Sequence, residues 1–268
     1  MAVTTFDVLG LDQVGEGRWS TVVRPDHCTP FGFLYGGTGI AVSCEAAERT
    51  TDRPLAWITT QFVGSPGPGD RLDVEVRTVA EGRSSSQTQV TVTVDGRPVI
   101  SSLAAHNLRP GGDQVGFVEM PDVPAPEECG PFIDTFDTHA GSFFENLERR
   151  HAVGRLAHEA IDQPERGPMA VWTRLKSGES GSASTQAFIA DLGPLFVAAA
   201  LGVMPGGTSL DNTQRMIDAT PTDWLLLELV PDGYSHSIGH STVRLWSRDG
   251  RLMGLAQQSA ILRTSHHT

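Results

Sequence analysis

The sequence has few basic residues, few cysteines and no long apolar run, and each shortage excludes a class of protein. Its 268 residues carry 20 Lys and Arg against 32 Asp and Glu, a net charge of −12. Nucleic-acid binders normally present a basic face, so we expect no nucleic acid partner. No apolar run reaches the ~18 residues of a membrane span. The longest candidate, Leu192–Val203, is interrupted by two glycines and a proline. We therefore expect a folded globular protein without a membrane span.

The few cysteines indicate the compartment. Cys28, Cys44 and Cys129 cannot all pair with one another, and none lies in a CxxC motif. Residues 1–20 contain acidic side chains and lack the basic segment followed by an apolar stretch that marks a secretory signal. Together these features predict a reduced, cytoplasmic protein.

Two stretches of the chain share a pattern, which indicates an internal duplication. Leu55–Arg109 ends in VDGRPVISSLAAHNLR, and Thr208–Arg263 ends in SRDGRLMGLAQQSAILR. The Asp-Gly-Arg at residues 95–97 recurs 154 residues later, and Thr60-Gln61 matches Thr213-Gln214 at a spacing of 153. Two copies of about half the chain imply one duplicated fold rather than a solenoid of short repeats.

Each copy predicts a strand, an apolar helix and then an antiparallel meander of strands. Alternating apolar and polar residues predict the strands. An Asp-Gly pair in each copy predicts a hairpin turn, of type I′ at Asp95-Gly96. The predicted strands are 17–23, 71–79, 87–94 and 99–107 in the first copy and 143–151, 169–175, 224–230, 241–246 and 253–262 in the second.

The predicted helices are Gly37–Thr50 and Ser184–Ala200, the second with Ser184 as its N-cap. Pro194 lies inside the second helix, where it should kink the helix or end its first segment. Both helices are more apolar than a surface helix, so we expect a sheet to wrap around each. Between the copies, the proline-rich segment Met120–Pro131 predicts an extended linker. The predicted domains are therefore 1–112 and 133–268, joined by a linker at 113–132.

A helix wrapped by an antiparallel sheet and duplicated in one chain resembles the double hotdog fold. The chain is similar over most of its length to the acyl-CoA thioesterase II family. In the first copy the resemblance rests on Tyr35-Gly36-Gly37 and on the pattern Phe62, Pro66-Gly67 and Asp70. In the second copy it rests on Val171-Trp172-x-Arg174, Asp191, Asp223-Trp224-Leu225-Leu226, Gln258 and Arg263. The resemblance implies an α+β fold of two tandem repeats, each with a long central helix wrapped by an antiparallel β-sheet.

The resemblance also implies a catalytic site in the second copy. The family holds a water molecule with an Asp, a Thr and a Gln, and in this chain the Asp matches Asp191 and the Gln matches Gln258. A gapless reading puts Ser209 at the Thr position, where Ser keeps the hydroxyl, and a shift of one residue would put Thr208 there. The family commonly has His-Gly-Gly before the first helix, where this chain has Tyr35-Gly36-Gly37.

The chemistry of thioester hydrolysis fits these residue types. Asp191 could orient or deprotonate the water, because a carboxylate accepts hydrogen bonds without donating them. Its place in an apolar helix would be costly if it is buried, which is typical of functional carboxylates, although an exposed or Arg-paired carboxyl is the alternative. Ser209 and Gln258 would fix the water, but strand alternation does not decide whether Gln258 or Gln257 faces inward. In the first copy, helix alignment puts the position of Asp191 near Glu45, which could form a second site or a vestige.

Three further residues are expected to bind substrate. Gly36 and Gly37 allow close approach of the backbone, and Arg263 is expected to meet the phosphates of CoA. No cofactor and no metal are expected, since His236 and His240 lack a third ligand at a suitable spacing.

The sequence therefore predicts an acyl-CoA thioesterase that releases free carboxylic acid and CoA, with acyl-CoA as its partner. A homo-oligomer of double-hotdog units is expected from the family. The alternative function is a noncatalytic acyl- or CoA-binding protein. A hotdog hydratase would need a histidine near the helix, and neither Gly37–Thr50 nor Ser184–Ala200 contains one.

Overall fold

The computed structural model describes residues 9–109, 111, 115–132, 141–156, 159, 164, 166–167, 169–178, 180–203 and 206–263. The helices and strands of its first half are β1 (Asp12–Gly15), β2 (Arg18–Val22), the 3-10 helix η2 (Pro25–His27), α1 (Gly36–Thr51), β3 (Leu55–Phe62), β4 (Arg71–Glu81), β5 (Ser85–Val94) and β6 (Arg97–Asn107). Those of its second half are the 3-10 helix η3 (Phe143–Asn146), β7 (Leu147–Val153), β8 (Met169–Leu175), α2 (Ala183–Ala190), α3 (Gly193–Leu201), β9 (Gly207–Met216), β10 (Leu225–Ser235), β11 (Ile238–Ser247) and β12 (Leu252–Leu262).

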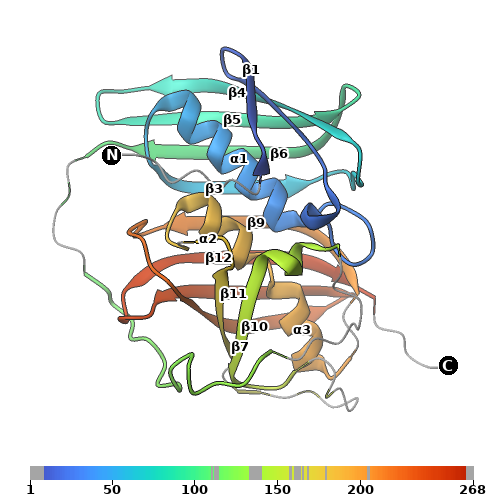
Figure 1. Ribbon diagram of the computed structural model, residues 1–268, viewed down its shortest axis with the longest axis vertical. Helices are drawn as coiled ribbons and strands as arrows, with labels where there is room; N and C mark the ends of the chain where they lie inside the picture. Colours follow the sequence, from blue (N-terminus) through green and yellow to red (C-terminus); the bar gives the residue numbers. More distant parts are fainter. Residues whose placement is uncertain are drawn as a thin grey trace.

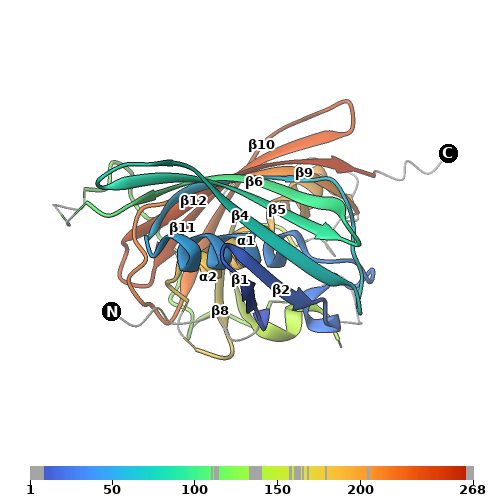
Figure 2. The ribbon, with the colours of Figure 1, turned by 90° about the horizontal axis from the view of Figure 1, so that it is seen from above.

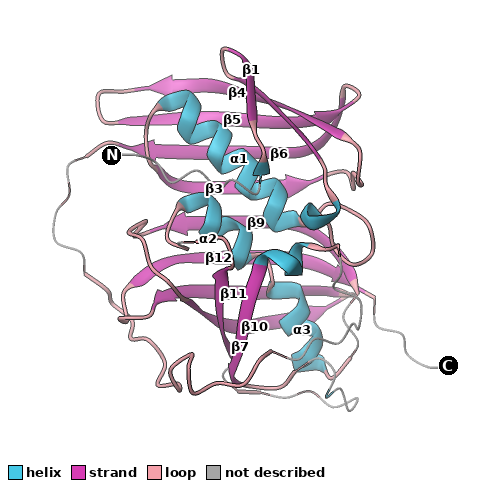
Figure 3. Ribbon diagram, in the orientation of Figure 1, coloured by secondary structure: helices cyan, strands magenta, loops and turns pink. Residues whose placement is uncertain are grey.

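The described strands of both halves join in one antiparallel sheet. The sheet has 12 strands in the order β1-β2-β4-β5-β6-β3-β9-β12-β11-β10-β8-β7. The helices lie on one face of this sheet (Figures 1 and 3), and the sheet curves over them (Figure 2). The predicted meanders are confirmed, and the two meanders meet where β3 pairs with β9. The predicted boundaries 1–112, 113–132 and 133–268 stay a prediction.

The hairpin turns differ between the halves. Asp95-Gly96 has positive φ at both residues, as the predicted type I′ turn requires. At the corresponding pair in the second half, Asp249-Gly250, only Gly250 has positive φ, and its N–H bonds to the carbonyl of Ser247 at 3.0 Å. This turn is therefore a longer one, built as a type I turn followed by a left-handed residue. A two-residue turn at His236-Ser237, with positive φ at both residues, joins β10 to β11 and was not predicted.

The helix of the second half is broken, whereas α1 runs without interruption over 16 residues. Pro194 lies in the first turn of α3, and the break before it confirms that Pro194 ends the first segment of the predicted helix. The single long helix expected in this half is therefore wrong. So is the N-cap assignment, because Ser182 rather than Ser184 caps α2 by accepting a hydrogen bond from the backbone N–H of Thr185.

The two halves are related by a local two-fold axis. Thr59 on β3 lies directly opposite Thr213 on β9, with their hydroxyl oxygens 2.7 Å apart and 154 residues between them in the chain. A residue that pairs with its own counterpart marks a two-fold axis. The spacing of 154 therefore holds here as well, and the match of Thr60-Gln61 with Thr213-Gln214 at 153 is wrong by one residue.

The linker packs against the face of the sheet that the helices leave open. Trp172, Trp224 and Trp246 form a buried cluster on that face, with Met120 and Val123 packed against it. Trp172 also donates a hydrogen bond from Nε1 to the carbonyl of Pro124 at 2.8 Å. Strand β8 and the first part of β10, Leu225–Leu229, are therefore buried on both faces, which explains their nearly continuous apolar sequences.

One stretch of the described chain, Ala183–Leu201, is long and apolar enough to pass for a membrane span. It consists of α2 and α3, and most of it is buried inside the structure. The core helices of a globular protein have the same composition, because a sheet rather than lipid surrounds them.

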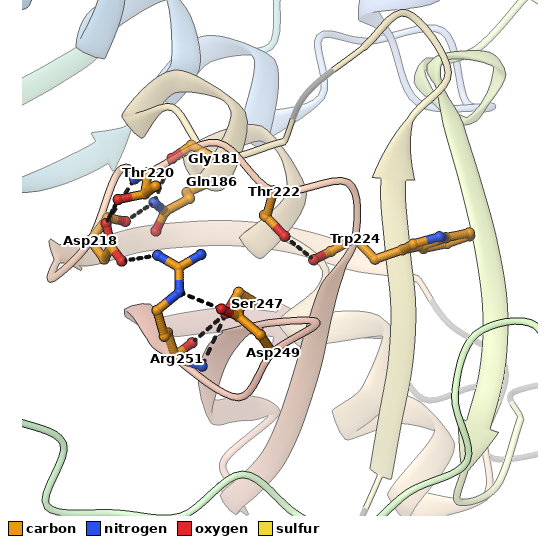
Figure 4. A network of polar contacts seen from close by, with 9 residues as sticks. All are labelled: Gly181, Gln186, Asp218, Thr220, Thr222, Trp224, Ser247, Asp249 and Arg251. Carbon is orange, nitrogen blue, oxygen red and sulfur yellow. Dashed lines mark hydrogen bonds and ion pairs between the residues drawn. The ribbon is translucent and has the colours of Figure 1, made fainter.

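A polar network joins the start of α2 to two neighbouring turns (Figure 4). Arg251 donates to the carboxylates of Asp218 and Asp249. Gln186 on α2 donates from Nε2 to the backbone carbonyls of Asp218, at 2.6 Å, and Gly181, at 2.9 Å. These bonds tie α2 to the turns that follow β9 and β11.

Candidate active site

Asp191 lies where the helix of the second half breaks. It is the C-cap of α2, with φ −82° and ψ 27°, and α3 begins two residues later at Gly193. Its side chain is only 6% exposed. The helix break therefore presents a carboxylate inside the core, close to backbone groups that a continuous helix would have used for itself.

Three donors hold this carboxylate. Its Oδ1 accepts hydrogen bonds from Asn212 Nδ2 and Gln258 Nε2, both at 2.7 Å. The backbone N–H of Gly37, in the first turn of α1, also bonds to it. Burial raises the pKa of Asp191 to about 7, and the three hydrogen bonds oppose that rise by stabilising the charged form. Asp191 therefore changes charge near neutral pH, as a general base requires.

A β-bulge turns Ser209 toward the Asp191 carboxylate. Asp211 pairs with Ser259 and Ser209 pairs with Ala260, so Leu210 is an extra residue in β9. Bulges re-aim the side chains beside them. Ser209 consequently points to the inner face of the sheet, where its Oγ accepts a hydrogen bond from Gln258 Nε2 at 2.9 Å. Thr208, the other candidate for this position, is exposed.

Gly36 and Gly37 allow α1 to approach Asp191. A Cβ atom at Gly36 would overlap Asp191 Oδ2, and one at Gly37 would overlap the carbonyl oxygen of Phe188 and the ring of Tyr35. The first turn of α1 therefore meets the end of α2 at backbone distance. This contact brings the positive end of the α1 dipole to the carboxylate.

Asp191 and Ser209 line a cavity of about 490 Å³ between the two halves. Gly36, Thr208 and Arg263 line it as well, so the structure brings these predicted residues together, while Gln258 and Gly37 lie behind the lining. Seven phenylalanines contribute to its apolar wall: Phe31, Phe33, Phe62, Phe132, Phe143, Phe144 and Phe196. An apolar cavity with a few convergent polar groups is typical of a small-molecule site.

Tyr35 supports the helix break from the side of the first half. Its hydroxyl donates to the carbonyl of Phe188 at 3.0 Å, and its ring stacks on Phe143. The last carbonyls of α2 would otherwise lack partners. At this position, where His is common in the family, Tyr35 therefore stabilises the end of α2 just before Asp191.

Two family models together match most of the chain. Models of the N-terminal and C-terminal domains of acyl-CoA thioesterases match residues 24–106 and 121–262. The chain belongs to the acyl-CoA thioesterase family. The resemblance seen in the sequence is thereby confirmed. No curated protein matches the chain significantly.

Solved structures agree with this membership. A protein from Novosphingobium aromaticivorans, provisionally described as a thioesterase, is 30% identical over 94% of this chain and 98% of its own, with a TM-score of 0.83. A hotdog-fold protein of unknown function from Alicyclobacillus acidocaldarius is 20% identical over 95% and 96%, with a TM-score of 0.82. An acyl-CoA thioesterase II from Mycobacterium marinum is 17% identical over 98% and 99%, with a TM-score of 0.75. The chain therefore has a hotdog fold.

Glu45, which lies near the position of Asp191 in the helix alignment, has a different environment in the first half. Glu45 lies on α1, buried beside Ser184 at the start of α2. Its Oε1 has no hydrogen-bond partner, and Arg49 Nη1 is 4.0 Å away. Burial raises the pKa of Glu45 as well. Unlike Asp191, however, Glu45 sits within a continuous helix and does not line the cavity.

Asn212 is the residue of this site that the sequence did not reveal. It lies on β9 and is completely buried. One signal was available, because Asn is uncommon in strands and an inward-facing Asn needs a partner. Its direction could not be read from the sequence, since the bulge at Leu210 interrupts the alternation of β9.

Proposed function

We propose that this thioesterase-family protein hydrolyses acyl-CoA to a free carboxylic acid and CoA, with Asp191 and Ser209 as its catalytic residues and Gln258 as the residue that positions both. The observation that supports this most strongly is the Asp191 carboxylate, buried, held by three hydrogen-bond donors and exposed to an apolar cavity. Water is the nucleophile, and the acyl–sulfur bond is the bond that breaks.

Asp191 acts as the general base. Its pKa of about 7 makes it ionised in a large fraction of molecules near neutral pH, yet basic enough to take a proton from attacking water. The proton then passes from Asp191 to the departing sulfur of CoA. The water molecule thus supplies its OH to the acyl group and its remaining hydrogen to the CoA thiol.

Ser209 and Gln258 form a hydrogen-bonded pair beside this base. Gln258 donates from Nε2 to both Ser209 and Asp191. Because Ser209 Oγ accepts that bond, its own hydroxyl hydrogen is left to point into the cavity. Ser209 can then hold the attacking water or the thioester oxygen. Gln258 therefore acts through its two neighbours rather than by touching the substrate.

The negative charge that develops on the thioester oxygen needs donors. The first turn of α1 brings the backbone N–H of Gly36 and the positive end of a helix dipole beside Asp191, while the N–H of Gly37 bonds to Asp191 itself. Such groups stabilise an oxyanion without rearrangement. The phenylalanine-lined wall accepts the acyl group, and Arg263 at the end of β12 meets the CoA phosphates.

A panel of acyl-CoA substrates of graded chain length tests the function, with a thiol-reactive dye to detect released CoA. We expect release with at least one chain length, and its loss in Asp191→Asn. Binding of acyl-CoA without release from any substrate would instead favour the noncatalytic acyl or CoA binder. We also propose a reduced, cytoplasmic location, which is supported by three cysteines that are all buried and unpaired.

A further inference from the structure

We propose that Asn212 is a positioning residue that, together with Gln258, fixes the Asp191 carboxylate so that its Oδ2 faces the thioester. This inference rests on the proposed function and deepens it. Asn212 is not among the residues expected from the family resemblance.

The geometry of the carboxylate carries the inference. Both amide donors, Asn212 Nδ2 and Gln258 Nε2, bond to the same oxygen, Oδ1, at 2.7 Å each. The other oxygen, Oδ2, faces the first turn of α1 at Gly36, which lines the cavity. Two donors on one oxygen stop the carboxylate from rotating about its Cβ–Cγ bond. The oxygen left for water is therefore always the one at the cavity.

Burial shows that Asn212 acts through Asp191. Its side chain is 0% exposed and it does not line the cavity, so it cannot touch substrate. Its Oδ1 is buried without a hydrogen-bond partner, and an unmade bond of this kind costs stability. An apolar residue would avoid that cost, as Ile58 does at the corresponding position of β3.

The bond from Asn212 also favours the charged form of Asp191. It opposes the effect of burial more than the bonds from Gly37 and Gln258 do. From β9 and β12 the groups facing Asp191 are neutral amides and the Ser209 hydroxyl. From α1 the titratable group is Tyr35, whose pKa burial raises well above its usual value, so it stays neutral. Arg263 shares the cavity. Removing the Asn212 bond should therefore raise the pKa of Asp191.

The test compares the pH profile of kcat/KM in the wild type and in Asn212→Leu, which keeps the branched shape and the number of side-chain heavy atoms. We expect the acid limb to move upward by about one pH unit, so that kcat/KM falls about tenfold at pH values below the limb. A charge-assisted hydrogen bond stabilises the ionised carboxylate by about the corresponding free energy. KM should change less than twofold. Asn212→Asp, which keeps the shape, should move the limb further, because two carboxyls in contact share a proton.

Gln214→Leu is the matched control. Gln214 lies two residues away on the same strand and is also buried, but it donates to the backbone carbonyl of Ala187 at 3.2 Å rather than to Asp191. We expect it to lower Tm without moving the acid limb. A structural role for Asn212 would give that same result, so the two variants separate positioning from folding.

A direct titration of the Asp191 carboxyl by ¹³C NMR makes the outcome independent of turnover. A higher midpoint in Asn212→Leu than in the wild type supports the inference, even if no acyl-CoA is hydrolysed. Equal midpoints, together with an unmoved acid limb in an active wild type, would overturn it. Failure of the wild type to hydrolyse any acyl-CoA would overturn the proposed function alone.

Discussion

The two halves of the molecule place opposite chemistry at corresponding positions of the same fold. Where the second half has Ser209, Asn212 and Gln258, the two-fold axis puts Leu55, Ile58 and Ala104 in the first half. Those three residues pack in one buried cluster with Ile40, Cys44 and residues of α2. A fully buried Leu or Ile contributes roughly 1.5–3 kcal/mol to stability. At these three positions the first half therefore contributes to the apolar core, while the second half buries polar side chains wholly or in part.

The backbones of the two halves differ in their helices but not at the β-bulge. Both β3 and β9 carry an extra residue at the matching point, Ala56 and Leu210, so the bulge itself does not make a site. The helices do differ, because α1 is continuous at Glu45 whereas α2 ends at Asp191. A carboxylate at a break meets free backbone groups and a cavity, and a carboxylate within a continuous helix does not.

The largest effect expected from this comparison is on turnover. Asp191→Asn should lower kcat/KM at least a hundredfold, because it removes the general base. Glu45→Gln, the matching change in the first half, should leave kcat/KM within about threefold. Release of CoA, measured at pH 8 with a thiol-reactive dye, compares the two variants. Equal losses would contradict the assignment of the reaction to one half.

A second pair of variants separates activity from stability. Ser209→Ala should reduce kcat/KM about tenfold or more with little change in unfolding. Leu55→Ala, at the corresponding position, should lower the free energy of unfolding by about 2–5 kcal/mol, because it opens a cavity in the core. Urea denaturation and kinetics on both proteins measure the two effects. Loss of activity in folded Leu55→Ala with Ser209→Ala unaffected would reverse the proposed roles.

Both halves also contain a carboxyl that should make stability depend on pH. Burial raises the pKa of Asp191 and of Glu48 to about 7, above the value in an unfolded chain. Between about pH 4 and 7 the folded state then binds more protons than the unfolded state, so stability falls as pH rises.

Each of these two carboxyls should lower the free energy of unfolding by on the order of a few kcal/mol over this pH range. Asp191→Asn and Glu48→Gln should each make this decrease smaller. Urea denaturation at pH 5 and pH 8 tests this, and a pH dependence that neither variant alters would show that other groups cause it.

The smallest effect tests the two-fold axis itself. Thr59→Val and Thr213→Val each remove one partner of the hydrogen bond at the axis, so each should cost about 1 kcal/mol of unfolding free energy. The double variant should cost less than the sum, because both changes remove the same bond. Additive losses would show that the hydroxyls do not interact.

Much of the fold could be predicted because period-two patterns and glycine turns are local properties. Strand β8 was predicted at its observed bounds, Met169–Leu175, and Pro194 indicated the helix break. The capping residue was missed because Ser182 and Ser184 are equally good caps by type. The expected strand at 143–151 was also misplaced, since η3 occupies its first residues and β7 begins at Leu147.

The site was harder to predict because it depends on contacts between distant segments. Asp191 and Gln258 came from the family resemblance, and strand alternation alone could not orient Gln258. Asn212 was missed because the extra residue Leu210 moves Ser209 and Asn212 to the same face, a three-residue spacing that no regular strand gives. Such bulges are set by pairing across the sheet, which a single sequence does not display.

The central claim is that one of the two corresponding positions, the one in the second half, binds the thioester. Isothermal titration with a non-hydrolysable acyl-CoA analogue, in which an extra methylene separates the sulfur from the carbonyl, tests this most directly. We predict one molecule bound per chain, with binding weakened when Gly36→Val fills the approach to Asp191 and unchanged in Glu45→Gln. A stoichiometry of two, or binding lost in Glu45→Gln and retained in Gly36→Val, would contradict it.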